Sequence, residues 1–199
     1  MAKENVIKLP NPAVKGKISL EEAIAKRRSK RNFVNKDLTL EQISQLLWSA
    51  QGITGEKGTF NFRAAPSAGA LYPMEIYLVT RDGLFHYLVQ EHGLERLVKE
   101  DLRDALANAA LGQGSVSQAG ADIVICAVYP RVTVKYGERG GRYAFIEAGH
   151  IAQNIHLEAV ALGLGSVPVG AFDDAQVKKA LSLPAEQEPL YIIPVGYVK

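Results

Sequence analysis

The chain has 199 residues, of which 47% are hydrophobic, so it can bury one sizeable core and we expect a single domain. Its 23 basic and 21 acidic side chains nearly balance, which argues against a protein that binds nucleic acid through its net charge. The single cysteine, Cys126, the lack of an apolar stretch of roughly 20 residues and the lack of a secretory signal predict a cytoplasmic protein that does not enter a membrane.

Signals for helices come first in the chain. After an extended arm over residues 1–17, Ser19 and Glu22 have the spacing of a capping box, and they predict a helix that runs into the basic segment KRRSKR. Thr39 and Gln42 have the same spacing before LEQISQLLWSAQ, in which the apolar residues form one stripe. Two helices are therefore predicted before the first strand.

Five runs rich in β-branched and aromatic residues predict strands over Glu75–Thr80, Leu84–Gln90, Leu94–Val98, Asp122–Tyr129 and Leu190–Tyr197. RDG and EHG have the form of tight turns, which would join the first three strands into an antiparallel meander. Further helices are predicted over EDLRDALANAAL, from about Gly141 to Leu162, and over Asp174–Leu181. Because strands and helices occur in separate runs, the sequence predicts an α+β domain.

The long predicted helix is apolar nearly all round. Small residues such as Ala144, Ala148 and Ala152 leave room for close helix contact, while Ile151 and Ile155 are large. A helix of this kind is usually buried. In a chain of this length, a second subunit is one way to bury it.

The segment Lys26–Arg31, KRRSKR, places five basic side chains around one serine. Without them the chain has 23 − 5 = 18 basic and 21 acidic side chains, a net charge of −3, so the segment is a local concentration of positive charge. The planar fork of arginine suits the oxygens of a phosphate. A solvated helix end, whose dipole favours basic residues, explains the segment equally well at this point. A nucleic-acid patch is less favoured, because no aromatic residues are interleaved.

Two loops consist mainly of small residues. PSAGALYP precedes the first predicted strand, and small side chains there would let backbone N–H groups approach a flat or phosphorylated ligand. A plain connection would have the same composition. GLGSVPVGAF, Gly163–Phe172, follows a helix, so it is neither a dinucleotide fingerprint nor a Walker-A loop.

Lys135 and Tyr136 are candidate proton-transfer groups if burial moves their pKa values toward neutrality, although adjacent Lys and Tyr also occur as ordinary surface residues. The four histidines and Cys126 have no metal-ligand spacing, so we expect no metal.

Eight segments resemble, in the expected order, the flavin-dependent nitroreductase family and more closely its SagB-type dehydrogenase branch, whose best-known members oxidise azoline rings in peptides. They are LPNP, RRSKRNF, LLWSAQGIT, PSAGALYPMEIYLV, KYGERGGRY, EAGHIAQNIHLEA, GLGSVPVGAFDD and EPLYIIPVG. The resemblance implies one FMN-binding domain over residues 1–199, with a central, mostly antiparallel sheet flanked by helices and a long central helix. It also implies a homodimer of the domain-swapped type, with FMN in the interface.

By position, the resemblance implies that the basic segment holds the FMN phosphate and ribityl group, with the last residue as a further phosphate candidate. It implies that PSAGA of the partner subunit lies against the isoalloxazine ring, and that backbone N–H groups of PVGA face the N5 and O4 edge. The implied cofactor residues are Arg27, Arg28, Ser29, Arg31, Pro66, Ser67, Ala68, Ala70, Pro168, Val169, Gly170, Ala171 and Lys199.

Lys135 and Tyr136 match the Lys-Tyr pair of the azoline-oxidising enzymes, so the resemblance implies that they handle the substrate proton. Those enzymes are generally longer and act with a cyclising partner, and these 199 residues leave no room for a peptide-docking domain. Three functions remain open, because one fold serves several chemistries. They are NAD(P)H-dependent reduction of nitroaromatic or quinone acceptors, oxidation of an azoline-like or peptide-derived substrate, and flavin binding without catalysis.

Overall fold

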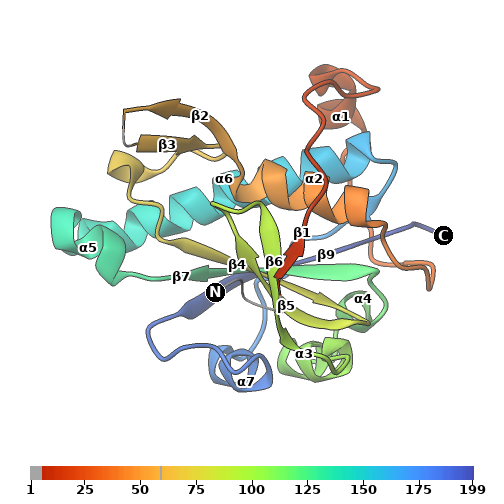
Figure 1. Ribbon diagram of the computed structural model, residues 1–199. Coiled ribbons are helices and arrows are strands. Elements are labelled where there is room, and N and C mark those ends of the chain that lie inside the picture. The colour runs from red at the N-terminus through yellow and green to blue at the C-terminus, as the bar shows by residue number, and fades with distance from the viewer. Residues whose placement is uncertain (1–5, 59) are drawn as a thin grey trace.

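The computed structural model describes residues 6–58 and 60–199. Its main sheet contains β1 (Val6–Lys8), β4 (Met74–Thr80), β5 (Gly83–Leu88), β6 (Gly93–Val98), β7 (Ala121–Ala127), β8 (Gly165–Ser166) and β9 (Glu188–Gly196). The strand order is β1-β6-β5-β4-β7-β9-β8, and each neighbouring pair is antiparallel (Figure 1). The predicted α+β class and mostly antiparallel sheet are confirmed.

The predicted meander corresponds to β4, β5 and β6, in which Tyr77 lies opposite His86 and Tyr87 opposite Leu94. Three predicted strands were too long at their C-terminal ends, the one over Leu190–Tyr197 by a single residue, because β9 ends at Gly196. β5 ends at Leu88 because residues 89–92 form the turn, with His92 at φ 44°. β7 ends at Ala127 because the chain turns into a helix three residues later.

The helices are α1 (Leu20–Lys26), α2 (Leu40–Gln51), α3 (Arg103–Ala109), α4 (Gly114–Ser117), α5 (Pro130–Tyr136), α6 (Arg139–Ala161) and α7 (Asp174–Ala180). The predicted capping box at Thr39 and Gln42 is present in full. At α1 only half of it forms. The Ser19 hydroxyl accepts from the Glu22 N–H, whereas the Glu22 carboxylate pairs with Lys26.

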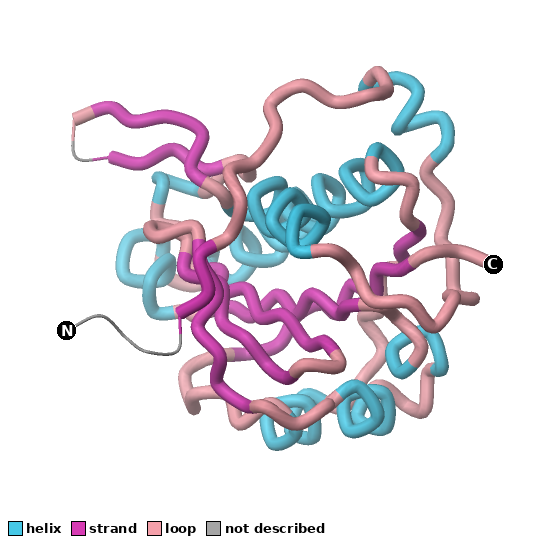
Figure 2. Tube along the Cα trace, turned by 45° about the vertical axis from the view of Figure 1, so that its right-hand side comes forward, coloured by secondary structure: helices cyan, strands magenta, loops and turns pink. Residues whose placement is uncertain are grey.

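Helices cover both faces of the sheet, with α2 and α6 on one face and α3 and α7 on the other (Figures 1 and 2). Side chains that alternate along β7 point to the two faces of the sheet in turn, so the core is divided into two clusters, one on each face. Ile123 and Ile125 belong to the cluster that includes α2 and α6, while Val124 and Cys126 belong to the cluster with α3 and α7. None of the helices formed by the described residues is long and apolar enough to cross a membrane.

Six strands and α-helices were not predicted, namely β1, β2 (Ile53–Lys57), β3 (Phe60–Arg63), α4, α5 and β8. β1 lies in the expected arm and pairs with β6, and the short β8 lies in a predicted loop and pairs with β9. β2 and β3 form a hairpin that projects from the body in Figure 2, and α4 is a single short turn. α5 contains Val132, Thr133 and Val134, which are poor helix formers. It forms because Pro130 occupies its first turn and Val132 is buried in the core.

Candidate functional site

The basic segment after α1 lies along β8 and the C-terminus. Ser29 forms a parallel bridge with Ser166, and the backbone N–H of Lys30 donates to the Ser166 carbonyl at 3.0 Å. The Lys199 N–H donates to the Asn32 carbonyl at 3.3 Å. These bonds hold the basic segment against β8 and the C-terminal residues and fix the backbone from which the basic side chains extend.

A cavity of about 680 Å³ opens at this junction, lined by Ser29, Lys30, Arg31, Asn32, Val198 and Lys199. We call it the basic cavity. The three charged residues that line it are all basic, and the serine and asparagine add polar groups. This donor set suits a multiply charged anion such as a phosphate monoester. Three of the predicted cofactor residues, Ser29, Arg31 and Lys199, therefore meet at one place.

The other two predicted arginines point elsewhere. Arg27 lies near His156, and burial together with the Arg27 charge lowers the pKa of His156 to about 4. The His156 Nδ1 bonds to the Ser166 hydroxyl at 2.8 Å, which ties α6 to β8 beside the basic cavity. The Arg28 guanidinium turns back and donates to the carbonyls of Ala25 at 3.0 Å and Arg27 at 2.7 Å, so it caps the end of α1.

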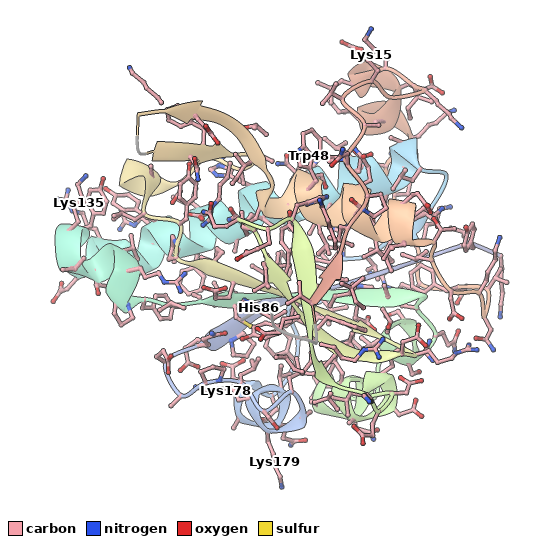
Figure 3. The ribbon with its side chains drawn as sticks, viewed as in Figure 1. Lys15, Trp48, His86, Lys135, Lys178 and Lys179 are labelled. Carbon is pink, nitrogen blue, oxygen red and sulfur yellow. The ribbon has the colours of Figure 1, made fainter. Side chains whose placement is uncertain are left out.

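A larger cavity, of about 1110 Å³, lies between residues 11–20 and the helices α2 and α6. It contains none of the predicted cofactor or catalytic residues. Its lining includes Trp48, Leu157 and Leu162, and Figure 3 places Trp48 beneath the chain that leads to α1. Three lysines line this larger cavity, but Glu41 and Glu158 line it too, whereas every charged residue of the basic cavity is basic. We therefore take the basic cavity as the candidate anion site.

The second predicted group, Pro66–Ala70, lies at the opposite end of α6. It contains a short 3₁₀ turn over Ala68–Ala70. Gly69, Ala70 and Tyr72 have φ values of 63°, 54° and 47°, a region that non-glycine residues rarely enter. Strained backbone of this kind is concentrated at functional sites.

Lys135 and Tyr136, the last residues of α5, extend over this loop. A Cβ atom built on Gly69 would lie 2.8 Å from the Tyr136 hydroxyl and 2.9 Å from the Lys135 ammonium. The Tyr136 ring packs edge-on against Tyr143, with centroids 4.9 Å apart. Figure 3 places Lys135 at the outer end of α5. The structure therefore joins the predicted catalytic pair to the predicted ring-binding loop.

An ion-pair network fixes α5 to the sheet behind the loop. Arg131 pairs with Glu75 in β4, and the other Glu75 oxygen bonds to His86 at 2.6 Å. Burial disfavours the charged form of Glu75, but the bonds from His86 and Arg131 outweigh it and lower the pKa of Glu75. Arg131 is one helical turn before Lys135, so this anchor sets the position of the Lys135 side chain.

Pro168–Ala171, the third predicted group, continues from β8 along β9. Val169 exchanges backbone hydrogen bonds with Ile192 at 2.9 and 3.0 Å, and the Ala171 carbonyl accepts from Gln113 at 2.9 Å. Among the described residues, the N–H groups of Gly170 and Ala171 have no backbone acceptor. Both residues are exposed, so these N–H groups are available to a ligand.

The basic cavity and the Gly69 loop are too far apart to act on one small ligand within a single chain. They lie at opposite ends of α6, whose 23 residues extend about 34 Å at 1.5 Å per residue (Figure 1). A site that uses both groups requires two copies of the chain.

Sequence reasoning missed Glu147, which is 1% exposed and lies beneath the Gly69 loop. A signal was present, because Glu147 lies within the stripe formed by Ala144, Ala148 and Ile151. A charged residue at an apolar position of a helix indicates a buried polar partner.

Comparison with known proteins identifies the relatives. The model of the nitroreductase family matches residues 24–197. MJ1384 of Methanocaldococcus jannaschii, provisionally named a nitroreductase, is 42% identical over 185 residues, which cover 90% of this chain and 91% of MJ1384. A crystal structure from Ralstonia eutropha JMP134, with the same provisional name, is 30% identical, with a TM-score of 0.87, and the match covers 98% of this chain and 90% of that one.

Two further relatives have named activities or substrates. The microcin B17-processing protein McbC of Escherichia coli is 27% identical over 164 residues, and the match covers 76% of this chain but only 60% of McbC. The NADPH:FMN oxidoreductase of Vibrio harveyi, solved with NAD⁺, is 25% identical, with a TM-score of 0.67, and the match covers 90% of this chain and 69% of that one.

Proposed function

The chain belongs to the nitroreductase family, and on this premise we propose that it is an FMN-dependent oxidoreductase that uses NAD(P)H to reduce nitroaromatic or quinone acceptors. One observation carries the proposal. Ser29, Arg31 and Lys199, which sequence reasoning assigned to the FMN phosphate, line one cavity whose charged lining residues are all basic. The NADPH:FMN oxidoreductase of Vibrio harveyi supports both the cofactor and the electron donor.

The residues present fit FMN. Ser29, Arg31 and Lys199 would hold the phosphate, Pro66–Ala70 would lie against the ring, and the free N–H groups of Gly170 and Ala171 would donate to its polar edge. When bound, FMN would supply hydride transfer at N5. The small side chains of the loop would leave the opposite ring face open to substrate, and the positive cavity would bind the tail without a metal ion.

We infer that the enzyme is a homodimer. The proposal needs the basic cavity and the Gly69 loop at one flavin, and these groups lie at opposite ends of α6. Two copies related by a two-fold axis would bring each basic cavity to the loop of the other copy and build two equivalent sites. Exposed apolar side chains of α1 and α6, among them Leu20 at 61% and Phe145 at 60%, would provide surface for such an interface.

A second function is favoured by the convergence of Lys135 and Tyr136 over Gly69. In this alternative the protein is a SagB-type dehydrogenase that oxidises an azoline-like or peptide-derived substrate. The reaction would remove a hydride from the substrate, which FMN would accept, and a proton, which Lys135 would receive in its neutral amine form, with Tyr136 beside it. Molecular oxygen would then take the electrons. The similarity to McbC, which processes microcin B17, supports this alternative.

The test begins with the visible spectrum of the purified protein, which should show a bound flavin that releases FMN on denaturation. NADPH or NADH is then added without oxygen. Rapid bleaching supports the proposed reductase, whereas a flavin that no nicotinamide reduces favours the dehydrogenase. A colourless protein that does not bind added FMN would contradict both.

A further inference from the structure

A buried chain of polar side chains lies beneath the Gly69 loop. Gln51, at the end of α2, is 0% exposed, and Glu147, in α6, is 1% exposed. The Gln51 Nε2 donates to the Glu147 carboxylate at 3.2 Å, and the Gln51 Oε1 accepts from the Arg63 guanidinium at 3.2 Å. Three elements, α2, β3 and α6, therefore meet at one amide, whose orientation is set by a charge on each side.

Both ends of this buried series of polar side chains reach the loop. Burial raises the pKa of Glu147, while interactions with the Ser67 hydroxyl and the Gln51 amide oppose this effect. The Ser67 hydroxyl in turn accepts from the Tyr72 N–H at 2.9 Å. At the other end, the Arg63 guanidinium lies 4.4 Å from the centre of the Tyr72 ring, and the Arg63 N–H donates to the Tyr72 hydroxyl at 3.3 Å.

The segment held in this way is the strained one. Ala70 and Tyr72 are non-glycine residues with φ values of 54° and 47°, and they lie on either side of Leu71. Such residues persist only where surrounding contacts hold them. Backbone–backbone hydrogen bonds within the segment are few, namely Ala70 N–H to the Ser67 carbonyl at 3.1 Å and a weaker 3.4 Å contact from Leu71 N–H to the Ala68 carbonyl.

We propose that Arg63, Gln51 and Glu147 form a loop clamp. They are positioning residues that keep residues 67–72 in the strained conformation in which Gly69 faces Lys135 and Tyr136. The importance of this conformation for turnover rests on the proposed function. The clamp itself is a property of the protein without cofactor, so it can be tested separately.

The test is amide hydrogen exchange of residues 67–72 in the cofactor-free protein. Glu147→Ala should speed exchange at Ala70 and Tyr72 by at least about tenfold, because it removes the buried partner of the Gln51 amide and of the Ser67 hydroxyl. Glu147→Gln keeps a side-chain oxygen for the Gln51 amide and should restore most of the protection. The matched control is Glu158→Ala on the same helix, where burial also raises the pKa but the partner is Gln45.

Ser67→Ala provides an independent variant that leaves the buried residues intact. It removes the acceptor of the Tyr72 N–H and should speed exchange at that amide without changing α6. Unchanged exchange in Glu147→Ala and Ser67→Ala would overturn the clamp. Exchange of residues 67–72 that is as fast in Glu158→Ala as in Glu147→Ala would also overturn it. If exchange responds as expected but the protein binds no FMN, the clamp stands and the proposed function fails. If FMN binds and exchange does not respond, the clamp fails and the proposed function stands.

Discussion

Gly69 and Tyr136 are so close that a methyl group on Gly69 would lie 2.8 Å from the Tyr136 hydroxyl. The Lys135 ammonium would be only 2.9 Å from the same methyl group. The absence of a side chain at Gly69 is therefore what allows two polar groups of α5 to reach the loop, and it gives the glycine a role besides its positive φ.

Gly69→Ala should separate these two roles. The left-handed conformation at φ 63° should cost about 1–2 kcal/mol of unfolding free energy, and the methyl group should also displace Tyr136 and Lys135. The control is Gly112→Ala, where φ is 72° and no atom lies within 4 Å of the added methyl group. Urea unfolding should show similar losses in both variants, whereas only Gly69→Ala should lose turnover. Equal turnover losses would mean that backbone strain alone is responsible.

Lys135→Ala distinguishes the two candidate reactions. If Lys135 takes up a substrate proton, its removal should slow azoline oxidation by about 10²–10⁴-fold while the protein keeps its FMN. NAD(P)H oxidation with a quinone acceptor should change little. Val134→Ala, at a residue 84% exposed on the same helix, is the control. Normal azoline oxidation by Lys135→Ala would show that Lys135 is an ordinary surface residue with no role in the reaction.

Arg31→Ala should weaken FMN binding by about 1.5–3 kcal/mol, or roughly 10- to 150-fold in Kd, because it removes a charge-assisted bond to the phosphate. Fluorescence titration of the cofactor-free protein with FMN measures the change. Riboflavin, which lacks the phosphate, should bind the wild type and Arg31→Ala with equal affinity. Lys179→Ala, on α7 at the bottom of the view in Figure 3, changes a residue that does not line the basic cavity and should bind FMN normally. An unchanged Kd for Arg31→Ala would place the phosphate elsewhere.

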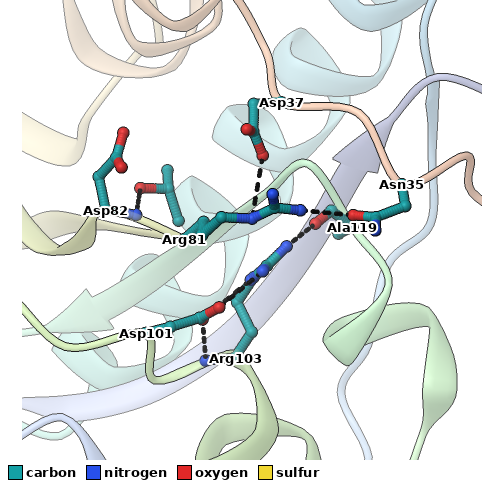
Figure 4. A network of polar contacts seen from close by, with 8 residues as sticks. Asn35, Asp37, Arg81, Asp82, Asp101, Arg103 and Ala119 are labelled. Carbon is teal, nitrogen blue, oxygen red and sulfur yellow. Dashed lines mark hydrogen bonds and ion pairs between the residues drawn. The ribbon is translucent and has the colours of Figure 1, made fainter.

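Asp122 gives the fold a pH dependence that is independent of the site. It is 0% exposed, and neither carboxylate oxygen has a hydrogen-bond partner among the described residues. Pro194, its neighbour in β9, has no N–H to offer. The nearby Arg103 guanidinium is bonded to Asp101 and to the Ala119 carbonyl (Figure 4). Burial therefore raises the pKa of Asp122 well above its ordinary value, against the opposing charge of Arg103.

The sign of the effect follows from this shift. The folded protein binds the Asp122 proton more tightly than the unfolded chain, so stability falls as the pH rises between the two pKa values, by about 1.4 kcal/mol per pH unit. Asp122→Asn keeps the shape and removes the titration. The unfolding free energy of Asp122→Asn should rise relative to that of the wild type as the pH increases from about 4, the pKa range of an unfolded aspartate. Asp104→Asn, at an exposed position in α3, is the control, and parallel pH profiles for Asp122→Asn and the wild type would contradict the account.

Much of the fold could be predicted because its signals are local. The apolar stripe and capping box of α2, the length of α6 and the turns of the meander all depend on neighbouring residues. α5 could not be predicted, because Val132, Thr133 and Val134 favour strands and only core packing makes this segment helical.

The candidate site was predicted in part for a similar reason. Composition located the basic segment and the small-residue loops, and resemblance assigned their roles. No local pattern could show that Lys199 meets Arg31, that Arg28 turns back onto α1, or that α5 lies over Gly69. These relationships depend on the sheet order, which places β8 and the C-terminus beside the basic segment.

The central claim is that each flavin site takes its basic cavity from one copy and its loop from the other. Co-expression of two differently tagged variants tests it. Arg31→Ala combined with Lys199→Ala should disable the cavity, and Ala68→Arg should block the loop, so each variant alone should retain no FMN. A mixed dimer isolated through both tags should regain about one FMN per two chains, because one of its two sites combines two unaltered halves. A mixed dimer that stays colourless, or a wild-type monomer that binds FMN, would contradict the claim.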